Sequence, residues 1–94
     1  MVIGICSIEL GLAGNESLKD KRSVIKPLLI HLRREFNVSV AEVGELDAWR
    51  SATIGVAAVS NDAAYVHGLF EKLVHWIEDS HLQVEVQDWQ VEIV

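Results

Sequence analysis

The sequence predicts an α+β domain in which two helices cover one face of a four-stranded antiparallel sheet. Two observations lead to this prediction. Strand-like and helix-like segments follow one another in the order β-α-β-β-α-β, so the chain holds two strand–helix–strand units. Its 94 residues suffice for only one hydrophobic core, so we expect residues 1–94 to form a single domain.

The first two elements are a strand and a helix. Residues 2–12, VIGICSIELGL, are rich in β-branched and apolar residues that partly alternate, which predicts a strand. The small polar residues AGNE then predict a loop. Ser17 followed by Asp20 resembles a capping box, and apolar residues recur at helical spacing from Leu18 through to Phe36, which predicts a helix.

Pro27 lies inside this predicted helix. It removes the backbone hydrogen bond to the Ser23 carbonyl, which costs about 3 kcal/mol in an ideal helix. We therefore expect a bend near Ser23, and the alternative is a new helix that begins at Pro27.

The remaining segments carry strand, turn and helix signals. They predict a strand at 37–43, a wide turn at 44–51, a strand at 52–60, a helix, and a last strand at 84–94. Asn61 or Asp62 can cap the helix, whose inward face is formed by four apolar residues: Val66, Phe70, Leu73 and Ile77. The apolar residues of the last strand change phase before Trp89, which predicts a bulge near Asp88.

This order gives the ferredoxin-like α+β arrangement, βαββαβ, in which one face of the sheet is normally wet. The first strand places Cys6, Ile8 and Leu10 on its core side. Ile3 and Ile5 lie on the other side, where polar residues are expected. Either this open face forms a homodimer interface that includes Ile3 and Ile5, or the two residues are tolerated surface aliphatics.

Composition sets the class of protein. Half of the residues are hydrophobic and 23% are charged, which is typical of a globular domain. The longest apolar run, VIGIC, is far shorter than the ~20 residues that cross a bilayer, and it does not resemble a signal peptide, so we expect no membrane association. The single cysteine excludes an internal disulfide, and we expect a cytoplasmic protein.

Charge is distributed unevenly along the chain. Eight Lys and Arg against fourteen Asp and Glu give a net charge of −6, which argues against general affinity for nucleic acid. Residues 17–36 nevertheless hold six basic residues against two acids, a balance of +4, and the rest of the chain has a balance of −10. Charges more than roughly 8–10 Å apart are largely screened at physiological salt, so a local basic surface can act independently.

Four of these basic residues share one side of the predicted helix. At 100° per residue, they lie within an arc of about 60° at the edge of the buried face: Lys19, Arg22, Lys26 and Arg33. Lys21 falls inside the apolar arc, where it should snorkel or pair with an acid at the rim of the sheet. Its position beside the helix N-terminus also makes it a candidate for anion binding. The stripe either balances acids elsewhere in the fold or contacts RNA phosphates.

The predicted turn at 44–51 adds two residues to this candidate RNA-binding or anion-binding site. Trp49 and Arg50 could supply a stacking contact to a base. The alternative is that Trp49 folds back over the edge of the sheet.

Four segments resemble a known family in their order and spacing. They are SLKDKR at 17–22, NVSVAEV at 37–43, DAWRSAT at 47–53 and GVAAVSND at 55–62, and together they are similar to the bacterial YlxP-like proteins. The resemblance covers nearly the whole chain and implies a ferredoxin-like fold in a cytoplasmic bacterial protein of a family of unknown function. Genes of this family often lie near those for translation initiation and ribosome-binding factor A, which implies a role in translation or ribosome maturation. The resemblance supplies no catalytic or binding residues.

Several activities that this fold hosts do not fit the residues. Domains that stack RNA bases on the sheet need aromatic residues on the central strands, and residues 2–12 and 52–60 contain none. Metal-carrying domains need paired thiolates, whereas Cys6 is alone and is expected to be a buried small hydrophobe. The segment GLAG at 11–14 lacks basic residues and is expected to be a turn. The loop that follows the first strand also lacks the arginine with which small phosphatases of this topology hold phosphate.

Two histidines and two glutamates follow one flank of the second helix: His67, Glu71, His75 and Glu78. The histidines are about 12 Å apart along the axis, which is too far for one ion, so we expect a solvated face and predict no metal or cofactor. No Ser-His-Asp set can be assembled, so an enzyme is unsupported. Two hypotheses follow. One is a non-enzymatic accessory of translation or ribosome maturation that binds structured RNA or a ribosomal particle; the other is a homodimeric regulatory or protein-interaction module without nucleic-acid contact.

Overall fold

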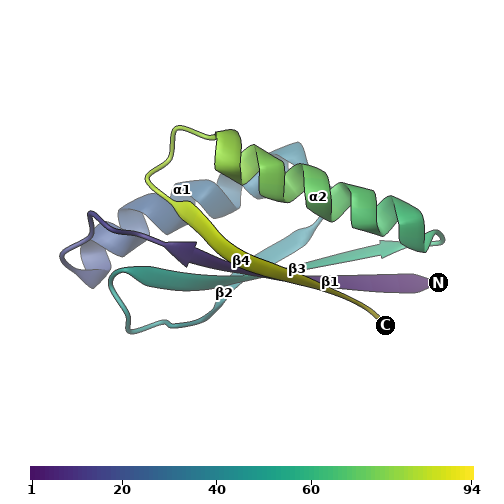
Figure 1. Ribbon diagram of the computed structural model, residues 1–94, viewed down its shortest axis with the longest axis horizontal. Coiled ribbons are helices and arrows are strands. Elements are labelled where there is room, and N and C mark those ends of the chain that lie inside the picture. Colours follow the sequence, from purple (N-terminus) through teal and green to yellow (C-terminus); the bar gives the residue numbers. More distant parts are fainter.

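The computed structural model describes all 94 residues and contains the six predicted elements in the predicted order (Figure 1). They are β1 (Val2–Gly11), α1 (Leu18–Glu35), β2 (Ser39–Gly44), β3 (Ser51–Ser60), α2 (Ala63–Asp79) and β4 (Glu85–Ile93). The ends of the strands differ from the predicted ones by no more than two residues. Neither helix is long and apolar enough to cross a bilayer.

The four strands form one antiparallel sheet in the order β2-β3-β1-β4. β1 and β3 are therefore central, and β2 and β4 are the edges. Both helices lie on the same side of the sheet and leave its other side uncovered (Figure 1). The ferredoxin-like α+β fold predicted from the sequence is thus confirmed.

The core lies between the sheet and the two helices. Cys6, Ile8 and Leu10 of β1 are fully buried, as their alternation predicted. The four apolar residues predicted to face inward from α2 are buried too: Val66, Phe70, Leu73 and Ile77. Burial of one such aliphatic or aromatic side chain contributes roughly 1.5–3 kcal/mol. Cys6 packs as a small apolar group, and burial raises the pKa of its thiol to about 11.

At Gly4, the backbone of β1 lies in close contact with side chains of α2. A Cβ atom at this position would overlap the Val66 side chain and lie 2.9 Å from Phe70 Cε2. Glycine is therefore required here, because any side chain would push α2 away from the sheet.

α1 begins at the predicted cap and continues past Pro27. Ser17 Oγ accepts a hydrogen bond from the Asp20 N–H at 3.1 Å, and the Asp20 carboxylate accepts one from the Glu16 N–H at 2.9 Å. The helix is unbroken, so the alternative of a new helix at Pro27 is wrong. Residues on both sides of the proline pack in the core, and their burial outweighs one missing hydrogen bond.

Each edge strand carries a bulge. Glu9 of β1 pairs with Asp88, and the next residue of β1 pairs with Val86, so Gln87 is an extra residue in β4. This confirms the bulge predicted near Asp88. β2 carries an extra residue, Val43, that no sequence pattern indicated.

Candidate anion-binding surface

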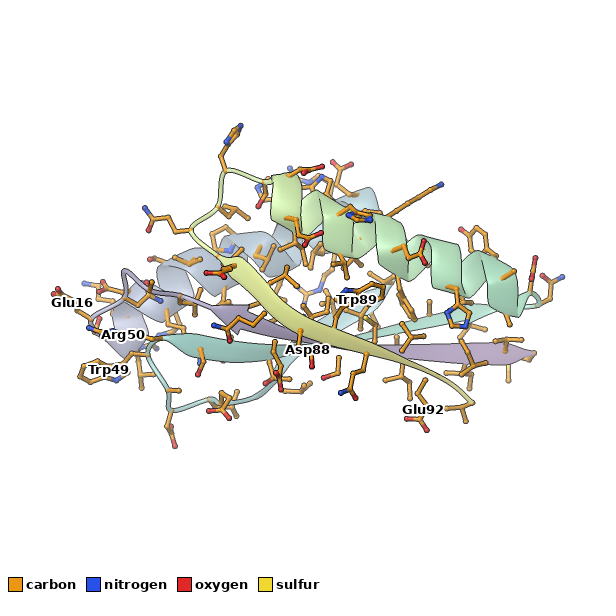
Figure 2. All side chains as sticks on the ribbon, viewed as in Figure 1. Glu16, Trp49, Arg50, Asp88, Trp89 and Glu92 are labelled. Atoms are coloured by element: carbon orange, nitrogen blue, oxygen red, sulfur yellow. The ribbon has the colours of Figure 1, made fainter.

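The β1–α1 loop and the β2–β3 loop meet beside the N-terminus of α1, where Figure 2 labels Glu16, Trp49 and Arg50. Asn15 joins the two loops: its Nδ2 donates to the Trp49 carbonyl at 3.1 Å, and its own carbonyl accepts from Arg50 Nε at 3.0 Å. The Leu12 N–H also donates to the Arg50 carbonyl, at 2.9 Å. These bonds hold Trp49 and Arg50 at the N-terminal end of α1.

Lys21 fixes the rest of the β2–β3 loop. Its ammonium donates to the carbonyls of Glu45 at 2.6 Å and Ala48 at 2.8 Å. The same nitrogen lies 2.7 Å from Glu42 Oε2 in an ion pair. The Lys21 side chain is only 3% exposed, so these three contacts replace the water that an ammonium group normally binds.

Lys21 therefore does not belong to the anion-binding set that the sequence predicted. An ammonium that is buried and neutralised by a carboxylate offers no charge to an external ligand. The expectation that Lys21 pairs with an acid at the rim of the sheet is confirmed, and the acid is Glu42. Glu45 has a φ of 59°, in the left-handed region, and the bond from Lys21 to its carbonyl stabilises this turn.

Three cations of the predicted stripe remain free. Lys19, Arg22 and Lys26 are exposed on α1, and none of them forms a salt bridge. Arg33 is also exposed, but its Nη2 donates to the Val40 carbonyl of β2 at 2.8 Å, so part of its guanidinium is engaged. No acid of the chain thus neutralises the first three by direct contact.

Trp49 and Arg50 lie next to this cationic end of α1. Trp49 is 51% exposed and, unlike Trp76 and Trp89, does not pack against the core. Arg50 is exposed, and only its Nε is bound within the chain. An exposed indole beside free guanidinium N–H groups can stack on a base and contact a phosphate.

Two residues that build this surface, Asn15 and Glu42, were not predicted from the sequence. Asn15 is 4% exposed although it lies in a polar loop, and no local pattern identifies it. Glu42 could have been found from the period of β2, because it shares a face with the buried Val40 and is an acid on the core side of the sheet. A half-buried acid near a strand end is a natural partner for the lysine in the apolar arc of α1.

The other candidate residues serve the fold or face solvent. The row expected to be a solvated face of α2 is exposed: His67, Glu71, His75 and Glu78. Within it, His75 Nδ1 lies 3.1 Å from Glu78 Oε1. No three His, Cys, Asp or Glu side chains lie close enough together to hold a metal ion. The GLAG segment forms a turn, closed by a 3.1 Å bond from the Asn15 N–H to the Leu12 carbonyl.

Ile3 and Ile5 lie on the uncovered side of the sheet. Ile5 is 40% exposed and Ile3 is partly buried. On β3 they pair with Val59 and Ala57, respectively. An interface between two copies at this position stays a prediction.

Comparison with known proteins identifies the family. Residues 3–91 match the family described as "Protein of unknown function (DUF503)". The chain belongs to this family. It is also similar to a protein of Bacillus subtilis (strain 168) described as "Uncharacterized protein YlxP", with 33% identity over 84 residues that cover 89% of this chain and 90% of the relative. The YlxP-like resemblance seen in the sequence is therefore confirmed.

Among solved structures, the de novo designed protein Foldit4 has a similar fold. The TM-score is 0.52 at 16% sequence identity, and the match covers 100% of this chain and 97% of the designed one. At that identity the similarity concerns the fold alone.

Proposed function

We propose that this protein binds structured RNA or a ribosomal particle and acts as a non-enzymatic accessory of translation or ribosome maturation in the cytoplasm. The contact is made by Lys19, Arg22, Lys26, Trp49 and Arg50, hereafter the cationic surface. The observation that carries the proposal is that three exposed cations of α1 have no acidic partner in a chain with a net charge of −6. The translation context is what the resemblance to YlxP-like proteins implies.

The geometry of the cationic surface fits phosphates better than base edges. Lys19 and Lys26 are seven residues apart, so the free cations extend over about 10 Å of the helix axis and can face several phosphates of a duplex. Phosphate contacts fix the position of a protein without reading sequence. Recognition would therefore depend on RNA shape, with Trp49 stacking on an unpaired base where the duplex ends or bulges.

Salt dependence tests the proposal quantitatively. The three unpaired cations of α1 alone predict a slope of about −2.7 for log K against log salt, so the affinity should fall at least about 40-fold between 50 and 200 mM salt, and a fourth phosphate contact from Arg50 would steepen the slope to about −3.6. The assay is fluorescence anisotropy with a labelled RNA hairpin that carries a bulge, together with co-sedimentation with ribosomal particles.

A charge-matched pair of variants separates location from net charge. Neutralising Lys19, Arg22 and Lys26 to Gln changes the net charge from −6 to −9 and should abolish most binding. The control reaches the same net charge of −9 by adding three negative charges at exposed positions away from α1, with Asn61→Asp, Gln83→Glu and Gln90→Glu. Binding that survives the first triple variant, or that is lost equally in both, would show that α1 is not the contact.

The second candidate function is the homodimeric interaction module predicted from Ile3 and Ile5. It is favoured by one observation, the exposure of apolar side chains on the uncovered side of the sheet, including 40% of Ile5 and 67% of Val59. Replacing Ile3 and Ile5 by Glu should then yield a folded monomer, and an unchanged elution volume would refute it. Acidic side chains on the same side of the sheet favour some binding partners over others.

A further inference from the structure

The side of the sheet opposite the helices, hereafter the open face, combines exposed aliphatic side chains with acids on the neighbouring strands β1 and β4. Strand alternation places every second residue of each strand on this face. The register across β2, β3, β1 and β4 then gives two complete rows: Ser39, Ala57, Ile5 and Glu92 in the first, and Ala41, Gly55, Ser7 and Gln90 in the second. Figure 1 shows no element beneath them.

The open face carries exposed aliphatic side chains on three of its strands, β1, β2 and β3. Its exposed aliphatic side chains include Ile5, Val59 at 67% exposed and Val43 at 58% exposed. The bulge at Val43 turns this side chain over Gly55, where an added Cβ would lie 3.0 Å from Val43 Cγ1. Ala41 and Ala57 lie on the same face and are small, so an incoming side chain or helix can approach the backbone closely there.

Every charged side chain of the open face is acidic. Glu9 and Asp88 face each other directly across β1 and β4, and Glu92 lies opposite Ile5. Figure 2 shows Asp88 and Glu92 on the side of β4 away from the helices. None of the three acids forms a salt bridge. Like charges directly opposite each other weaken a strand pair, so the chain keeps this arrangement against its own stability.

The charges decide which occupant suits the open face. A second copy stacked face to face would bring at least six acids together without one lysine or arginine, which costs binding affinity. A docked basic segment would instead neutralise Glu9, Asp88 and Glu92 while its apolar side chains cover Ile5 and Val59. We propose that the open face binds a basic amphipathic helix of another protein. This role is separate from the cationic surface, which lies on α1 and the β2–β3 loop beside its N-terminus.

The test uses a synthetic amphipathic helix of leucine and lysine, labelled with fluorescein, titrated with the full chain. The open-face variant combines Glu9→Gln, Asp88→Asn and Glu92→Gln. Its control removes three exposed acids from the helices, with Glu35→Gln, Glu71→Gln and Glu78→Gln, so both variants have a net charge of −3. We expect the open-face variant to bind about tenfold more weakly, since three surface ion pairs are lost, and the control to stay within about twofold.

Two results would overturn the proposal. One is an equal loss of affinity in both variants, which would mean that the peptide responds only to net charge. The other concerns self-association, measured by light scattering with and without Ile5→Ser and Val59→Ser. If the protein is a dimer or larger and this pair of substitutions makes it monomeric, the open face belongs to a second copy. A monomer whose affinity for the peptide falls with the same pair supports the proposal.

Discussion

Removing the Lys21 ammonium should lower the stability of the fold substantially. In Lys21→Met the carbonyls of Glu45 and Ala48 lose their donor, and the Glu42 carboxylate loses its cation. Breaking a buried ion pair from one side costs about 3–5 kcal/mol. The Glu42 side chain is 21% exposed and can recover some hydration, so we expect the lower end, about 3 kcal/mol. A small domain has a total stability of only about 5–15 kcal/mol, so this loss is large.

Urea denaturation measures this loss. With a slope of about 1–1.5 kcal/mol per M for a domain of this size, a loss of about 3 kcal/mol moves the midpoint down by about 2–3 M. Lys19→Met is the matched control, because Lys19 is exposed and unpaired, and it should change stability by no more than about 0.5 kcal/mol.

A second variant isolates the ion pair. The double variant Lys21→Met with Glu42→Leu removes both charges, so it should be more stable than Lys21→Met alone. If Lys21→Met costs no more than Lys19→Met, the loop does not depend on the buried ammonium, and the assignment of Lys21 to the fold rather than to the anion site loses its basis.

Two further predictions concern β1. Gly4→Ala should lower the free energy of unfolding by about 2 kcal/mol, because its Cβ overlaps Val66, whereas Gly68→Ala in α2 meets open space and should raise it by about 0.5–1 kcal/mol; similar effects in thermal melts of the two variants would contradict this packing. Because burial raises the pKa of Cys6 from 9.0 to about 11, the unfolded chain loses this proton first as the pH rises, so the free energy of unfolding should fall between pH 9 and pH 11. The loss should reach about 3 kcal/mol and be absent in Cys6→Val, and urea titrations of the two proteins with equal pH dependence would refute it.

The fold could be predicted because its signals are local and periodic. Alternation in β1 identifies Cys6 and Ile8 as core residues, and helical spacing identifies the inward face of α2. Ser17 is recognisable as a cap from its own side chain and the residue three positions later. Pro27 was harder to interpret, because the cost of its missing hydrogen bond is local whereas the burial that offsets it comes from the rest of the fold.

The arrangement of the candidate site could be predicted only in part, because contacts between distant loops leave no periodic signal. Helical geometry places Lys19, Arg22 and Lys26 in one stripe, and the structure leaves all three unpaired. The hydrogen bond from Asn15 to Trp49 joins residues 34 positions apart, and neither residue type predicts it. The stripe depends on one helix, whereas the loops beside it depend on the whole fold.

The two proposed surfaces can coexist because the fold keeps their charges apart. The free cations lie on α1, and Glu9, Asp88 and Glu92 lie on the open face, with the sheet between them. The molecule extends 23 Å along the vertical axis of Figure 1, on which the helices lie above the sheet, whereas charges are screened over about 8 Å at physiological ionic strength. An approaching anion near α1 therefore responds mainly to the local cations and little to the net charge of −6. An acidic small protein can in this way present one surface to phosphates and the opposite one to a basic partner.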